Sequence, residues 1–312
     1  MQASPIAPTK LPDTIHEAFF ALTAIASDHV VMQIKEGESY RQYTYGEVSL
    51  LIRGLASSLH EHGLGPGHRV ALVAENRPEW VIAHLSILTV GATAVPLDIH
   101  MPQEQLLSFL TTSNSRLVFV SSKTMAFIQG IPTTITVVNM DPATKSPHLS
   151  MKDLISQGQQ KPPVKREVNP DDVASLLYTS GTTKKPKGVL LTHRNFMANA
   201  KDIMGKDLAG PKDNFLVMLP LHHAYPFMIA YLVPILLGAR MTFLSSLKGP
   251  DLVQCIRETG ITIAVGVPQI FSMIRRSIFE ELSRRPAFVR PLITLLLGLS
   301  DFVRTHTRWN PG

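Results

Sequence analysis

The chain has 312 residues, of which 45% are apolar, so it can bury a substantial core and fits two domains or one large α/β unit. Its net charge of +6 is dispersed, which makes nucleic acid a weaker candidate partner than anionic lipid or an anionic small substrate. The single cysteine, Cys255, excludes an intrachain disulfide, and the N-terminus lacks the apolar core of a secretory signal, so we expect a cytoplasmic chain.

The first half of the chain alternates helix and strand. Thr44 and Glu47 have the spacing of a capping box, apolar residues follow at helical intervals, and Gly63 ends this predicted helix. The pattern then predicts, in chain order, a strand from residue 69, a helix over 78–91, a strand over 92–98, a helix from about 102 and a strand over 116–122. Strands separated by helices predict an α/β fold with a mostly parallel sheet and helices on both faces.

Residues 140–170 are rich in Pro, Ser, Gln and charge and show little apolar periodicity. We therefore place a sub-domain border there, with a first α/β sub-domain over residues 1–165 and a second over residues 166–285.

The second half repeats the alternation. We expect His193 to cap a helix that runs toward residue 205, and a helix beginning at Pro250 to end at Gly260. Strands are predicted over residues 215–219, 239–245 and 261–267, with a further helix over 227–237.

Two apolar segments raise the question of membrane contact. Residues 214–239 contain no charged side chain other than histidine and are long enough to cross a bilayer, but three prolines and two histidines interrupt them, so we expect a strand, a turn and a helix. Residues 291–300 are too short to cross, and the flanking Arg290 and Arg304 suit peripheral contact with an anionic inner membrane surface.

The stretch YTSGTTKKPKGVLLTH, over residues 178–193, concentrates hydroxyl groups, glycines and lysines between two strand-like runs. Converging N–H and O–H donors with added cations indicate a phosphate-binding loop, and the alternative is a solvated hairpin with a basic tip. The Walker pattern is excluded, because Pro186 stands where its second glycine is needed.

The exact order of these residues, from Thr179 to Gly188, resembles the phosphate-binding signature of the adenylate-forming superfamily, which includes acyl-CoA synthetases, luciferases and peptide-synthetase adenylation domains. The segment LPLHHAYPF over residues 219–227 resembles the family's acyl-pocket segment, and VGVPQIFSMI resembles a fatty-acid tunnel lining. The resemblance covers roughly residues 30–285, and residues 286–312 resemble the start of the helical insertion of long-chain members. It implies the stacked, mostly parallel sheets of the family's large N-terminal domain, in truncated form.

The resemblance also implies a reaction. ATP and a carboxylic acid, here a medium- or long-chain fatty acid, give an acyl-adenylate, and CoA or the phosphopantetheine of a carrier protein then takes the acyl group, with Mg²⁺ assisting. Lys187 and His223 are the implied catalytic residues, with His223 orienting the acyl carboxylate, while His222 is interpreted as packing or capping. The implied nucleotide-binding residues are Thr179, Ser180, Gly181, Thr182, Thr183, Lys184 and Gly188. No His or Cys cluster has zinc-ligand spacing.

Two features depart from the family pattern. Lys184 stands where the family usually has glycine, which would either strain the loop or hold phosphate more tightly. The sequence contains no Thr-Glu dipeptide of the adenine-contacting segment, and we expect the ribose-binding Asp and the lid domain with its lysine to be absent as well. Two hypotheses follow. In the first, the chain is an incomplete N-terminal portion of a ligase, which a missing part or a second chain completes. In the second, the chain is a non-catalytic remnant that binds a nucleotide or an acyl group.

Overall fold

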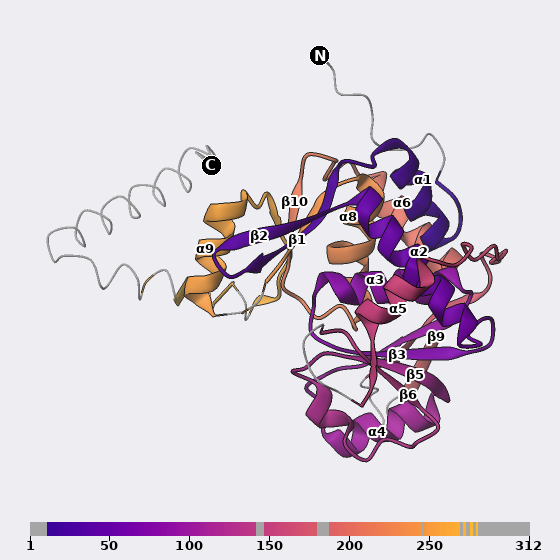
Figure 1. The fold of residues 1–312 in the computed structure, drawn as a ribbon. Coiled ribbons are helices and arrows are strands. Elements are labelled where there is room, and N and C mark those ends of the chain that lie inside the picture. The colour runs from indigo at the N-terminus through magenta and orange to yellow at the C-terminus, as the bar shows by residue number, and fades with distance from the viewer. Residues whose placement is uncertain are drawn as a thin grey trace, which may run out of the picture. The chain divides into compact units, whose positions relative to one another are not determined.

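The computed structural model describes residues 11–141, 147–179, 187–244, 246, 248–268, 271–272, 275–276 and 279. The chain divides by its internal contacts into two units, residues 1–245 with 259–265, and residues 246–258 with 266–312. The first unit holds two β-sheets (Figure 1). The described part of the second consists mainly of helix α9 (Gly249–Thr259), which carries the buried Cys255.

The larger sheet has seven strands in the order β7-β6-β5-β3-β4-β8-β9. All neighbours are parallel except the hairpin of β8 and β9, which confirms the predicted α/β class with a mostly parallel sheet. The strands are β3 (Arg69–Val73), β4 (Thr93–Pro96), β5 (Ser115–Val120), β6 (Thr136–Asn139), β7 (Leu149–Ser150), β8 (Val173–Thr179) and β9 (Lys187–Thr192).

Apolar side chains alternate between the two faces of this sheet, as a strand's period of two residues requires. Val70 and Leu72 belong to one buried cluster, whereas Ala71 and Val73 belong to another, which includes residues of helix α4 (Gln103–Thr112). Both faces are therefore covered, with α4 on the face opposite α3 (Figure 1).

The smaller sheet has the order β12-β10-β11-β1-β2, and only β1 and β2 are antiparallel. Its strands are β1 (Val30–Glu36), β2 (Ser39–Thr44), β10 (Asn214–Val217), β11 (Arg240–Phe243) and β12 (Ile263–Ala264). Strand β1 pairs with β11, so this sheet takes strands from both sides of the border expected at residue 165, as the larger sheet does with β8 and β9. The amino-acid composition of residues 140–170 indicated a polar connection, but the pairing of strands in three dimensions determines which strands share a sheet.

Helices fill the layer between the two sheets (Figure 1). One continuous core joins residues of β1, β3, β11 and these helices, so the two sheets share a single interior. The helices concerned are α1 (Ile15–Ile25), α2 (Tyr45–Glu61), α3 (Pro78–Thr89), α5 (Met151–Gly158), α6 (His193–Met204) and α8 (Val233–Leu237).

The helix starts differ from expectation in detail. Thr44 accepts a hydrogen bond from the Glu47 N–H as predicted, but the Glu47 carboxylate pairs with Arg41 instead of closing the capping box. Helix α6 is capped by Thr192, whose hydroxyl accepts from the Asn195 N–H, and His193 is buried in the first turn. A short polar side chain is the better N-cap, because its oxygen reaches the first N–H groups.

The charge-poor segment over residues 214–239 forms strand β10, a turn and a helical run, as expected. The run consists of α7 (Ala224–Phe227), the π-helical turn η2 (Met228–Leu232) and α8. Within the described part of the chain, no helix combines the length and apolarity that a bilayer crossing needs. Residues 286–312, expected to form a helical insertion, lie outside the described residues.

Candidate functional site

The phosphate-loop motif lies on the hairpin of β8 and β9. Thr179 pairs with Lys187 and Tyr178 with Gly188, so the two ends of the motif are paired where β8 ends and β9 begins. We call these two residue pairs the hairpin base. Of the predicted nucleotide-binding residues, the backbone of Thr179 and both Lys187 and Gly188 are described, and the others lie outside the described residues: Ser180, Gly181, Thr182, Thr183 and Lys184.

The hairpin base is packed against the body of the larger sheet. The Tyr178 ring stacks on Phe109 of α4, with ring centroids 4.0 Å apart and an interplanar angle of 5°. Gly188 lies against Leu176, and a Cβ atom at residue 188 would come within 2.8 Å of the Leu176 Cδ1. A side chain at residue 188 would therefore require the Leu176 side chain to shift.

The register of β4 and β8 connects this hairpin to a second polar group. Ala94 pairs with Ser175 in parallel, and β4 ends at Pro96, two residues before Asp98, whereas β8 continues to Thr179. Because parallel strands end at the same edge of a sheet, Asp98 and the end of β8 both follow strands at that edge. This is the edge at which ligands of open α/β sheets bind.

Asp98 is joined there by the histidine pair. The His222 Nε2 lies 3.6 Å from an Asp98 carboxylate oxygen, which also accepts a hydrogen bond from the His100 N–H. The His222 and His223 rings lie with centroids 4.2 Å apart. His222 is largely buried and His223 is exposed, so the residue interpreted as packing lies against the acidic side chain and the predicted catalytic residue faces outward.

Burial, reinforced by His223, lowers the pKa of His222 to about 4, while Asp98 acts to raise it and His100 to lower it. His222 is therefore neutral at pH 7, and its contact with Asp98 is not an ion pair. Its Nε2 has no hydrogen-bond partner among the described residues. A buried ring nitrogen of this kind suits a polar ligand group such as a carboxylate or phosphate oxygen.

The helical run after His223 is anchored in the core. His223 is the N-cap residue of α7, and Phe227 is fully buried among aromatic rings. The ring centroids of His84, Tyr231, Phe196 and Trp80 lie 5.1, 4.9, 4.8 and 6.4 Å from that of Phe227. The C-terminal side of the His222–His223 segment is thus fixed to buried structure.

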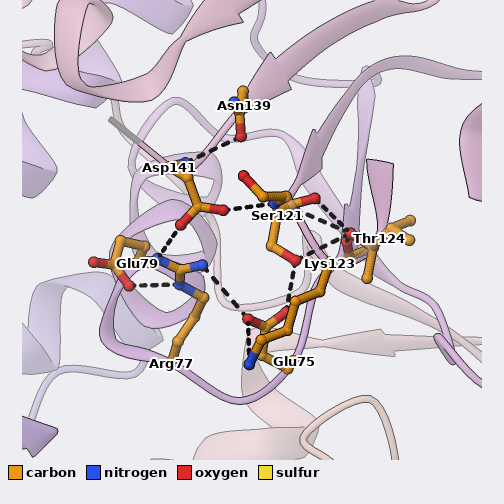
Figure 2. A network of polar contacts seen from close by, with 10 residues as sticks. Glu75, Arg77, Glu79, Ser121, Lys123, Thr124, Asn139 and Asp141 are labelled. Atoms are coloured by element: carbon orange, nitrogen blue, oxygen red, sulfur yellow. Dashed lines mark hydrogen bonds and ion pairs between the residues drawn. The ribbon is translucent and has the colours of Figure 1, made fainter. Parts of the chain in front are cut away.

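A network of charged residues lies at the carboxyl ends of β3, β5 and β6 (Figure 2). Arg77 Nε lies 2.7 Å from a Glu79 oxygen, and its terminal nitrogens lie 2.8 Å from Asp141 and 3.6 Å from Glu75. Hydrogen bonds from the Ser122 N–H and from Arg77 lower the pKa of Asp141 despite its partial burial. We call this set, with Ser121 and Lys123 on Glu75, the Arg77 network.

Sequence reasoning missed Asp98 and the Arg77 network. Their residues are short-range neighbours of predicted strands, and the only available signal was that each follows the carboxyl end of a strand in a parallel sheet. No group of three His, Cys, Asp or Glu side chains suited to a metal ion occurs within the described residues.

The fold and the hairpin motif together define an N-terminal domain of the adenylate-forming type. Residues 22–299 match the family model described as AMP-binding enzyme, so the chain belongs to that family, as its motifs predicted. The chain is 26% identical over 274 residues to 4-coumarate–CoA ligase 3 of Arabidopsis thaliana, covering 84% of this chain and 48% of the relative. It is 28% identical to fatty acyl-CoA synthetase A of Dictyostelium discoideum, covering 77% and 38%.

A solved structure agrees with the fold. The N-terminal domain of FACL13 from Mycobacterium tuberculosis superposes with a TM-score of 0.73 at 21% identity, covering 84% of this chain and 65% of that one. The chain spans about half the length of the curated relatives that it matches.

Proposed function

We propose that the chain is the N-terminal portion of an ATP-dependent acid–thiol ligase. The carboxylate of the acid attacks the α-phosphorus of ATP, pyrophosphate leaves, and a thiol then displaces AMP from the acyl-adenylate to give a thioester. The observation that supports this most is that the phosphate-motif hairpin follows β8 and that Asp98, which His222 contacts, follows the neighbouring parallel strand β4, so both come after carboxyl ends on the same edge of the larger sheet.

The roles follow from the chemistry of each group. Lys187, Thr179 and the hydroxyl residues of the hairpin would hold the phosphates of ATP, with Mg²⁺ carried on those phosphates. His223 would orient the acid's carboxylate, with the unpartnered His222 Nε2 next to it. Fixing two anions in one orientation is where such a site lowers the barrier most.

For the substrate, we propose a medium- or long-chain fatty acid, with CoA or a phosphopantetheine thiol as acceptor. The tunnel-like segment VGVPQIFSMI supports this choice, as does the printed name of the Dictyostelium relative. The coumarate relative shows that the family model alone does not select the acid.

The test is acid-dependent exchange of labelled pyrophosphate into ATP by the protein at its natural length, with fatty acids of increasing length compared with 4-coumarate. Lys187→Ala and Thr182→Ala should each abolish the exchange. Full activity in both variants would contradict the loop assignment, and ATP binding without exchange for any acid would favour the non-catalytic remnant.

A further inference from the structure

The side chain of Asn76 bridges the backbone just before the histidine pair. Asn76 lies in the turn after β3, where its Nδ2 donates to the Leu219 carbonyl at 2.7 Å and its Oδ1 accepts from the Leu221 N–H at 3.1 Å. Both polar functions of one amide are thus used on the two consecutive peptide groups that flank Pro220. Such a two-point contact fixes the direction of the segment as well as its position.

That segment determines where the two imidazole rings lie. The His223 N–H donates to the Pro220 carbonyl at 3.3 Å, and the His223 carbonyl accepts from the Phe227 N–H at 3.0 Å. Residues 219–221, which the Asn76 side chain contacts, therefore lead directly into the first turn of α7. We call the two hydrogen bonds of the Asn76 side chain the clamp. A shift of residues 219–221 would move the His222 ring relative to Asp98, because His222 directly follows Leu221, whose N–H the clamp holds.

Asn76 is itself held by its neighbours in the sequence. Residues 75, 77 and 79 belong to the Arg77 network, whose contacts connect the turn after β3 to Asp141 beyond β6 and to Ser121 beyond β5 (Figure 2). The side chain of Arg77 is only 14% exposed, so these contacts are shielded from water and constrain the turn more strongly than surface ion pairs do.

We propose that Asn76 is a positioning residue that holds the His222–His223 segment for the acid's carboxylate, and that the Arg77 network keeps Asn76 in place. The role rests on the proposed ligase function. The competing interpretation is that the contact only joins the turn after β3 to the segment after β10, with no influence on the reaction.

Asn76→Ala removes both contacts, and Asn76→Asp keeps an acceptor for the Leu221 N–H while losing the donor to Leu219. Asn214→Ala is the matched control. Asn214 also makes two side-chain hydrogen bonds, to the Thr259 carbonyl and from the Thr242 hydroxyl, at the opposite end of the same strand β10.

The first readout is hydrogen exchange at the Leu221 amide, which is independent of activity. Exchange should become about tenfold faster in Asn76→Ala, less so in Asn76→Asp, and unchanged in Asn214→Ala. Unchanged exchange in Asn76→Ala would show that the clamp does not operate and would overturn the inference.

The second readout is steady-state pyrophosphate exchange by the protein at its natural length. Asn76→Ala should lower kcat/KM for the acid about tenfold or more while KM for ATP stays within about twofold, and Asn76→Asp should recover part of the loss. Equal effects of Asn76→Ala and Asn214→Ala, or equal changes in both KM values, would reduce Asn76 to a structural contact. A wild-type protein without acid-dependent exchange would instead overturn the proposed function, with the Leu221 amide still reporting whether the clamp exists.

Discussion

Gly158 lies so close to Gly54 that a Cβ atom added to residue 158 would come within 1.8 Å of the Gly54 carbonyl oxygen. The two glycines lie where helix α5 crosses α2, and the Ser58 hydroxyl donates to the Leu154 carbonyl at the same crossing. The backbones approach each other directly there, so neither helix has room for a side chain.

Gly158→Ala should therefore lower the free energy of unfolding by about 3 kcal/mol or more, because backbone rather than a flexible side chain must move. Chemical denaturation measures the change. Gly205→Ala is the control, since a Cβ atom at that helix end meets nothing closer than 3.4 Å, and it should be neutral or slightly stabilising. A Gly158→Ala protein as stable as the wild type would contradict the close crossing.

Three buried histidines should make the fold sensitive to acid. Burial lowers the pKa of His16 to about 4 and the pKa values of His84 and His193 to about 3. Between these values and the ordinary value of 6.5 the unfolded chain binds protons that the folded chain excludes, so stability is complete above pH 6.5 and falls as the pH drops toward 4. Each histidine contributes a slope of about 1.4 kcal/mol per pH unit in that window.

His193→Asn tests this slope, since an amide oxygen can still accept the Ile15 N–H that now reaches the His193 Nδ1. The variant should lose one proton of uptake on unfolding at pH 5, as measured by the pH dependence of the denaturation midpoint. An unchanged slope in His193→Asn would mean that this histidine does not contribute to the acid sensitivity.

The surroundings of His222 predict opposite effects of two substitutions on its pKa. His223 lowers this pKa from the ordinary value and Asp98 raises it, so His223→Gln should move it upward from about 4 and Asp98→Asn should move it downward. Titration of the imidazole resonances by NMR gives both values. Shifts of the same sign in the two variants would show that Asp98 and His223 do not act on His222 through their charges.

Gly188→Ala should distort the hairpin base, because the new methyl group meets Leu176. ATP affinity should fall about tenfold, whereas Leu176→Val, which removes the clashing Cδ atom, should restore part of it in the double variant. Isothermal titration with ATP and Mg²⁺ on the four proteins of this cycle measures the coupling. Additive losses would show that the clash with Leu176 is not the cause.

Local patterns were sufficient for much of the fold. Helix α2 was predicted because its cap, its apolar spacing and its stop at Gly63 all lie within twenty residues or so of one another. Helix α5 was missed because its apolar face, with Met151 and Leu154, is short and lies within a polar stretch that reads as a linker. The β1–β2 hairpin was not predicted either, although β1 carries alternating apolar residues and Gly37 has the positive φ of a tight turn.

The candidate site divides in the same way. The hairpin signature is a run of consecutive residues, so its order alone identified the family. The contacts of Asn76 with Leu219 and of Asp98 with His222 join residues far apart in the sequence, and no local pattern of an Asn or Asp after a strand reveals its partner. Both contacts join residues that follow strands of the seven-stranded sheet to the segment that follows β10 of the five-stranded sheet, so they depend on how the two sheets pack.

Strand β1 lies between β2 and β11, and Gln33 on β1 hydrogen-bonds Thr242 on β11 across 209 positions of sequence. On the ribosome the β1–β2 hairpin therefore emerges with one edge unpaired and keeps it so until β11 has been made. During that interval the exposed edge of β1 can pair with other chains. Early chaperone contact should therefore raise the yield of folded protein, and a pause in translation before β11 should lower it. Recombinant production should accordingly improve at low temperature, where the hydrophobic association of half-made chains is weaker.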